Sequence, residues 1–185
     1  MKKLFLCAAL LIGIAGVSLF AWEPNDLTKY PDFTKAGDFL LNFGVGFDYP
    51  GTLGGDYIFV PPIRGTLDYN IAIGEKKLPF FIGAILGYSG YGHRKADWFF
   101  HKISIGGRFG YHFNWGIDKL DTYAVTTAGW MIYAGDGFSD QYKAGWPLFG
   151  MSFGGRYFIN NWFGFWAEAG YSSFSMFDIG LAFKF

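Results

Sequence analysis

The chain has 185 residues, enough for one domain of ordinary size, and its formal net charge is zero. Aromatic residues make up 23% of it and charged residues only 16%, so a soluble domain of this size would have few charges to cover its surface. The sequence has no run of basic residues, which argues against a nucleic-acid partner.

The first 21 residues have the pattern of a secretory signal peptide. Two lysines precede an apolar run over residues 4–17, and Ala21 follows at a plausible cleavage point. An uncleaved membrane anchor is the alternative, because the apolar run approaches the length of a spanning helix. Cleavage after Ala21 would also remove Cys7, the one cysteine, and leave the exported chain without a disulfide.

Residues 22–36 are polar and contain two prolines, which predicts an irregular segment on the periplasmic side. From Gly37 onward apolar residues alternate with small or polar ones, and no stretch is apolar for the roughly 18 residues that a spanning helix needs. The alternating segments are about as long as tilted membrane strands. They cover residues 38–49, 63–73, 79–89, 99–113, 122–134, 147–159, 162–172 and 176–185.

The segments between these strands have the composition of loops and turns. Residues 50–62 are rich in glycine and proline, and residues 90–97 and 136–146 are polar. Residues 114–121 and the Asn160-Asn161 pair predict turns.

Because side chains alternate between the two faces of a strand, each segment has an apolar face and a small or charged face. The last segment has Phe177, Ile179, Leu181, Phe183 and Phe185 on one face, with Asp178, Gly180, Ala182 and Lys184 on the other. In the third segment, apolar on both faces, we assign Phe80, Ile82, Ala84, Leu86 and Tyr88 to the outside. The fifth segment stays open, since Tyr123, Val125, Met131 and Tyr133 favour one face and Trp130 and Ile132 the other.

Eight such strands predict an all-β fold, an eight-stranded antiparallel up-and-down transmembrane β-barrel over residues 37–185. Tryptophans fall at predicted strand ends, where an aromatic girdle would meet the lipid headgroups: Trp98, Trp115, Trp146 and Trp162. A soluble barrel such as a lipocalin, apolar inside and polar outside, is the alternative. The density of aromatic and branched residues on one face favours the membrane.

The alternating apolar C-terminus, with Leu181, Phe183 and the terminal Phe185, resembles the assembly signal of bacterial outer-membrane β-barrels. The whole chain resembles small eight-stranded proteins of the OmpW/OprG, OmpX and opacity-protein type. The resemblance implies a monomer in the outer membrane, inserted by the β-barrel assembly machinery and surrounded by lipid. It also implies one of two functions: passage of small, often hydrophobic molecules, or surface-exposed adhesion and host interaction. Short predicted loops, about 8–13 residues, favour passage or a structural role.

The predicted inner face collects charged residues: Asp48, Arg64, Asp68, Lys102, Arg108, Arg156, Glu168, Asp178 and Lys184. They would form either a polar channel that selects solutes or a network of ion pairs that fills the lumen. We favour the network, because an eight-stranded barrel is only just wide enough for its own side chains. Inward glycines would still leave some space for water or a small solute.

No set of residues predicts catalysis or metal binding. His93, His101 and His112 lack metal-ligand spacing, and no serine is tied by spacing to a histidine and an acid. We therefore expect no catalytic residue, cofactor or metal, and not an enzyme.

Overall fold

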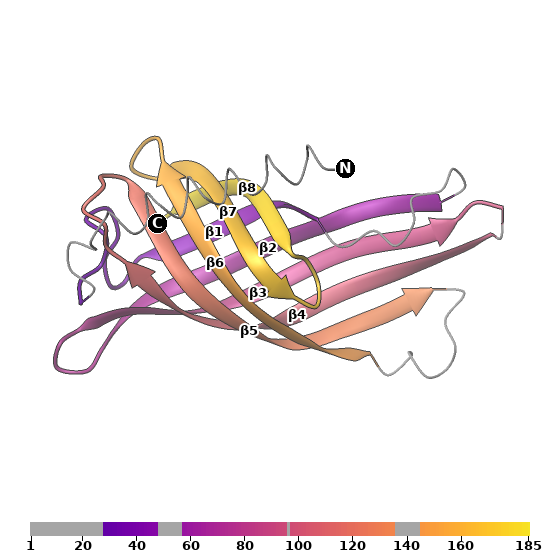
Figure 1. Cartoon of the computed structure of the whole chain (residues 1–185), viewed down its shortest axis with the longest axis horizontal. Helices are drawn as coiled ribbons and strands as arrows, with labels where there is room; N and C mark the ends of the chain where they lie inside the picture. Colours follow the sequence, from indigo (N-terminus) through magenta and orange to yellow (C-terminus); the bar gives the residue numbers. More distant parts are fainter. Residues whose placement is uncertain (1–27, 48–56, 96, 136–144) are drawn as a thin grey trace, which may run out of the picture.

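The computed structural model describes residues 28–47, 57–95, 97–135 and 145–185. In them eight antiparallel strands form a closed barrel, in which each strand pairs with its neighbours in sequence and β1 pairs with β8 (Figure 1). The predicted all-β, eight-stranded antiparallel fold is therefore confirmed. Among the described residues no helix is long and apolar enough to cross a membrane. The strands are β1 Phe39–Phe47, β2 Tyr57–Ile73, β3 Leu78–His93, β4 Trp98–Phe113, β5 Leu120–Gly135, β6 Trp146–Phe158, β7 Phe163–Ser172 and β8 Phe177–Lys184.

Both ends of the strand sequence meet at one end of the barrel, because Leu40 near the start of β1 pairs with Lys184 at the end of β8. We call this the terminal end, and the turns over residues 74–77, 114–119 and 159–162 lie at it. The opposite, far end has the β3–β4 turn, of which residues 94, 95 and 97 are described, and the turn over residues 173–176. The predicted signal peptide, residues 1–21, and Asp48 lie outside the described residues.

Two predicted loops were wrong in part, because strands continue into them. Residues 57–62, expected in a glycine- and proline-rich loop, are the first part of β2. Pro61 and Pro62 are accommodated by a shift of register between Val60 and Ile63, a position at which the missing N–H groups break no regular ladder. On the partner strand, β3 runs on to His93 through residues that had been expected in a loop.

Two glycines at the far end of β3 lie in the strand, although a loop was predicted there. Gly90 and Gly92 read as turn residues, yet both are in the strand, on the face that carries the Phe99 ring of β4. A Cβ on either glycine would lie 2.5 Å from a carbon of that ring. Glycine is therefore needed here for a close side-chain approach, not for a turn.

The barrel wall is of unequal height. Strands β1, β7 and β8 have 9, 10 and 8 residues, whereas β2 to β5 have 16 or 17 and β6 has 13. Ile63 is the residue of β2 nearest the far end that pairs with β1. Toward the far end, β2 has six further residues, 57–62. Figure 1 shows the long strands β2 to β5 projecting beyond the yellow β7 and β8. One side of the far end is thus a tall sheet and the other side a low one.

The two faces of the wall follow the predicted parity. Large apolar side chains are exposed on the outside of every strand, for example Phe43, Leu67, Leu86, Phe109, Phe153, Phe165 and Leu181. On β5 the structure decides the open assignment: Trp130 and Ile132 face outward, and Tyr123, Val125 and Met131 are buried inside. An apolar outside around a charged, buried inside is the arrangement of a membrane barrel and the reverse of a lipocalin.

Candidate functional site

The lumen contains one continuous series of alternating charges, which we call the ion-pair chain. It crosses the interior from strand to strand, and each inner member contacts two members of opposite charge. In order of contact the members are His112, Asp121, Arg156, Asp68, Arg108, Glu168, Arg64 and Asp178. All eight side chains are almost completely buried.

The contacts in the first half of the chain are those of strong, charge-assisted pairs. His112 Nδ1 lies 2.5 Å from Asp121 Oδ1, and Arg156 Nη1 donates to Asp121 Oδ2 at 2.7 Å. The other terminal nitrogen of Arg156 donates to Asp68, so this one guanidinium joins two carboxylates. Arg108 Nε lies 3.1 Å from the second oxygen of Asp68, an ion pair without hydrogen-bond geometry.

The second half of the chain is joined in the same way. Arg108 Nη2 donates to Glu168 Oε2 at 2.9 Å, and Arg64 donates to the other oxygen of that carboxylate. Arg64 Nη1 donates to Asp178 Oδ2 at 2.6 Å and completes the series. Since buried charges are costly unless paired, the alternation is what allows eight of them to share one lumen.

Both ring nitrogens of His112 lie within hydrogen-bond distance of side-chain oxygens. Its Nε2 lies 3.0 Å from Asn70 Oδ1, and the amide of Asn70 is oriented by its Nδ2, which donates to the Lys35 carbonyl at 3.2 Å. Both nitrogens of His112 therefore face oxygens that can only accept. Apart from His112, the chain consists of three arginines and four carboxylates.

Uncharged polar side chains brace the chain. Tyr123 donates its hydroxyl to Glu168 Oε2 at 3.0 Å and accepts from Trp166 Nε1 at 2.7 Å. Asn42 accepts from Arg156 Nε at 2.9 Å and donates to Thr66 Oγ1 at 2.7 Å. These bonds fix the positions of the charged groups as well as pairing them.

The structure brings together six of the nine charged residues expected in the lumen: Arg64, Asp68, Arg108, Arg156, Glu168 and Asp178. The Lys102 ammonium lies 5.1 Å from the ring centre of Phe174, nearer the far end, and Lys184 lies at the terminal end. Sequence reasoning missed Asp121, because it was assigned to a turn that ends earlier, at Lys119. Asp121 lies two residues before Tyr123 and so has the same parity. Extending the strand by one residue pair would have placed Asp121 on the inner face with Tyr123.

Residues 28–38 fold against the terminal end of the barrel, and we call them the N-terminal cap. The Phe33 ring packs 4.8 Å from that of Phe158, and Lys184 Nζ donates to the Phe33 carbonyl at 2.7 Å. Tyr30 accepts a bond from Asn114 at its own carbonyl, and Gly37 N donates to Asn70 O. The cap is thus tied to β2, β6, β8 and the β4–β5 turn.

Tyr30 of the cap contacts both the barrel wall and a member of the ion-pair chain. Its hydroxyl lies 2.6 Å from the Ile71 carbonyl oxygen and 2.8 Å from that of Phe80, and its ring lies 5.3 Å from the ring of His112. Burial, with Asp121 and Asp38 nearby, raises the pKa of the Tyr30 hydroxyl. The group therefore stays neutral and can keep donating to these carbonyls.

Two clusters of apolar side chains also occupy the lumen, and rings of the first lie against members of the ion-pair chain, for example Tyr123 against Arg156 and Trp166 against Arg64. The group nearer the terminal end packs with Phe33 of the cap and consists of Leu40, Phe81, Tyr123, Val125, Phe158, Trp166 and Ala182. The group nearer the far end packs with Tyr133 and consists of Ile85, Met131, Leu148 and Phe174. Charged and apolar side chains therefore occupy the interior from the cap to Phe174 in the β7–β8 turn.

The four tryptophans assigned to a girdle do not share one position. At the terminal end Trp115 packs with Phe113 and Trp162 with Phe183, both on the outer face. At the far end Trp98 and Trp146 are the first residues of β4 and β6, so they lie at strand ends as expected. Their parity is that of the inward Ser104 and Leu148, so the alternation turns these two rings toward the inner side of the wall.

No group of three histidine, cysteine or acidic side chains in the described part of the chain could hold a metal ion. No family model matches the sequence. Over 91 residues the chain is 31% identical to an uncharacterized protein of Treponema pallidum (strain Nichols), and the match covers 49% of this chain but 41% of that relative. The chain thus spans less than half the length of this relative.

Two solved structures resemble the barrel. The outer membrane protein OprG from Pseudomonas aeruginosa has a TM-score of 0.52 at 11% identity, over 86% of this chain and 99% of OprG. The Yersinia pestis outer membrane protein Ail has a TM-score of 0.49 at 12% identity, over 80% of this chain and 99% of Ail. The likeness to OprG extends over the whole barrel, and the apolar outer face suits the same medium. By fold, the chain is a closed eight-stranded antiparallel β-barrel similar to that of OprG.

Proposed function

We propose that this outer-membrane barrel is closed to solutes and acts through its surface-exposed far end, in adhesion or host interaction. The observation that carries the proposal is the filled lumen, with its ion-pair chain, its two apolar clusters and its N-terminal cap. This choice departs from the expectation of a passage for small molecules. The terminal end, with the cap, would face the periplasm.

The size of the barrel supports a closed lumen. Eight strands enclose little more than the volume of their own side chains, and here those include three arginines and several aromatic rings. A solute path would require the members of the ion-pair chain to separate in an interior of low dielectric. Separating buried charges is costly because neither partner regains water.

The tall wall supports a role at the cell surface. A membrane strand needs roughly 9–11 residues, which β1, β7 and β8 nearly match, so the far parts of β2 to β5 would project beyond the bilayer. On the inner side of this projection Trp98 stacks on Phe100 with ring centres 5.9 Å apart, and Tyr91 lies within 5.8 Å of both rings. Aromatic rings in such a position are typical of protein contact surfaces.

Single-channel recording of the refolded mature protein in a planar bilayer tests the closed lumen. A heat-dependent shift on a gel would first show that the barrel is folded. We expect no discrete conductance steps from the native protein, and steps from Arg108→Ala, because that change removes the guanidinium between Asp68 and Glu168. Steps from the folded native protein would contradict the proposal.

Passage of small molecules is the second candidate, and one observation favours it. Several buried polar atoms of the described residues lack a protein hydrogen-bond partner, among them Ser104 Oγ, Arg108 Nη1 and Arg64 Nε. Buried water satisfies such groups, so a narrow water-filled path beside the ion-pair chain is compatible with them. Osmotic shrinkage of vesicles that contain the protein would detect water or solute flux below the limit of single-channel recording.

A further inference from the structure

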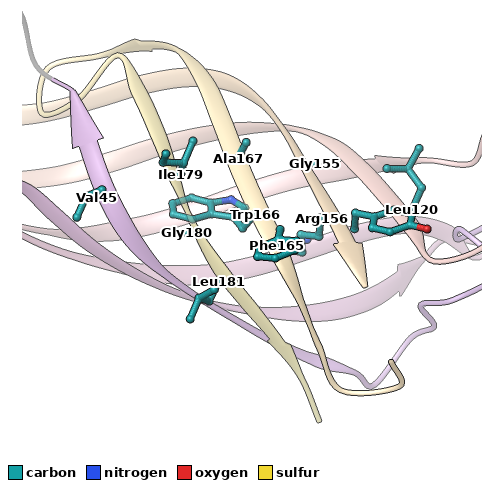
Figure 2. A pocket seen from close by; sticks show the side chains of 11 residues that line it. Val45, Leu120, Gly155, Arg156, Phe165, Trp166, Ala167, Ile179, Gly180 and Leu181 are labelled. Carbon is teal, nitrogen blue, oxygen red and sulfur yellow. The ribbon is translucent and has the colours of Figure 1, made fainter. Parts of the chain in front are cut away.

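The outer face of the barrel has a recess of about 640 Å³ where β6, β7, β8 and β1 lie side by side (Figure 2), and we call it the hollow. Across these strands Gly155 is opposite Ala167, Ala167 opposite Ile179, and Ile179 opposite Val45. The neighbouring row, nearer the terminal end, consists of Tyr157, Phe165 and Leu181. Two small residues beside a row of large ones create the recess.

Gly155 contributes to the hollow by lacking a side chain. A Cβ there would meet nothing nearer than a methyl carbon of Thr122 at 3.8 Å, so the wall itself leaves room for a larger residue. By contrast, a Cβ on the inward Gly154 would lie 2.3 Å from the Tyr123 ring. Close packing requires glycine at position 154 but not at position 155. Most other outward positions nearby are aromatic or branched, which makes the small pair Gly155 and Ala167 stand out.

We propose that the hollow binds one acyl chain of a phospholipid from the periplasmic leaflet. Its lining is almost entirely apolar, and its rim consists of side chains that are exposed to the membrane, such as Tyr157 (53% exposed) and Phe165 (55%). It extends from Leu120 at the terminal end to Ile179 and Val45, which lie two residues beyond the mid-strand pair Leu181 and Phe43, so it spans the terminal half of the wall and a little more. The choice of leaflet rests on the orientation proposed above, with the terminal end in the periplasm.

The shape of the hollow favours an acyl chain over a second copy of the protein. A recess flanked by Tyr157 and Phe165 admits a thin, flexible chain to its floor at Gly155 and Ala167. The sheet face of another barrel would rest on the protruding rings instead. A bilayer leaves no empty space at a lipid-facing recess, and a chain that enters it gains contacts with the floor and with the row of large side chains beside it.

Native mass spectrometry can test the hollow directly. The protein would be refolded into vesicles of phosphatidylethanolamine and phosphatidylglycerol, extracted with mild detergent and weighed with its bound lipids. We expect the native protein to retain one phospholipid and Gly155→Leu to lose it, because the new side chain occupies the floor. Gly65→Leu is the matched control: Gly65 also faces outward with no atom within 3.8 Å of an added Cβ, and it does not line the hollow.

Ala167→Leu, from the other side of the floor, provides a second variant if Gly155→Leu fails the heat-dependent gel shift. No retained lipid on the native protein, or equal retention by all variants, would overturn the proposal. A dimer mass that disappears in Gly155→Leu would overturn it in favour of a second copy as the occupant. Conductance of the same samples reports on the lumen alone, so a conducting barrel that still retains lipid would refute the closed lumen and leave the acyl-chain site standing.

Discussion

Asn42 and Phe43 are neighbours on β1, but the first faces the lumen and the second faces the outside of the barrel. Asn42 is completely buried in the lumen and bonded to Thr66 and Arg156, whereas Phe43 is 55% exposed on the outer face. The inner residue depends on particular partners from β2 and β6. The outer residue needs only an apolar surrounding, which any lipid supplies. The alternation therefore produces an inner face on which each residue needs particular partners, and an outer face that accepts any apolar residue. We call the outer positions permissive.

The largest expected effect comes from breaking the inner face at Arg156→Ala. This change leaves Asp68 and Asp121 without the guanidinium that joins them, and it removes a partner of Asn42. We expect a loss of about 3–5 kcal/mol in the free energy of unfolding, the usual cost of removing one partner from a buried ion pair. Urea unfolding in phospholipid vesicles, followed by tryptophan fluorescence, measures it.

Arg94→Ala is the matched control, because Arg94 is an exposed arginine in the β3–β4 turn. Its removal should change the free energy of unfolding by less than about 0.5 kcal/mol. Equal losses for the two variants would show that Arg156 is solvated and that the ion-pair chain does not stabilise the barrel.

A smaller effect is expected on the outer face at Phe43→Arg. Phe43 is the fifth of nine residues in β1 and therefore lies near the middle of the bilayer. An arginine there should cost roughly 2–4 kcal/mol, because the charge must be taken into hydrocarbon. Phe43→Leu, measured by the same unfolding assay, should cost much less since leucine is also apolar. If arginine were tolerated as well as leucine, Phe43 would not face lipid.

The outer face could be predicted well from sequence because lipid imposes one simple rule on every second residue. Strand number, order and outward parity follow from that rule, down to the choice of Leu86 over Ile85 on β3. The ends of strands were harder: Pro61 and Gly90 carry turn signals, but a register shift and a neighbouring ring keep both inside strands.

The inner face could be predicted only as a set of charges, not as a pattern of contacts. Which acid meets which arginine depends on how far each side chain reaches across the lumen, and Arg64 spans from β2 to Asp178 on β8. The same limit applies to His112, whose two partners come from β5 and β2. The docking of Tyr30 depends on carbonyl oxygens that no residue pattern marks.

The smallest expected effect on stability is that of Phe185→Ala. The Phe185 side chain makes no contact in the lumen, and most of its ring is exposed. The backbone N of Phe185 donates to Phe39 O and its carbonyl accepts from Phe39 N, and the substitution keeps both bonds. The ring is 72% exposed, so its loss should change the free energy of unfolding by less than about 0.5 kcal/mol.

The amount of Phe185→Ala protein in the outer membrane should nevertheless fall, if the C-terminal residue belongs to an assembly signal as its resemblance implies. Phe153→Ala is the control, because that ring is similarly exposed at 66% and lies outside the last strand. Immunoblots of membrane fractions compare the two variants with the native protein. A drop for Phe185→Ala alone, with unfolding unchanged, would separate recognition during assembly from stability of the finished wall. Equal levels of the two variants would mean that the terminal ring is one more permissive position of the outer face.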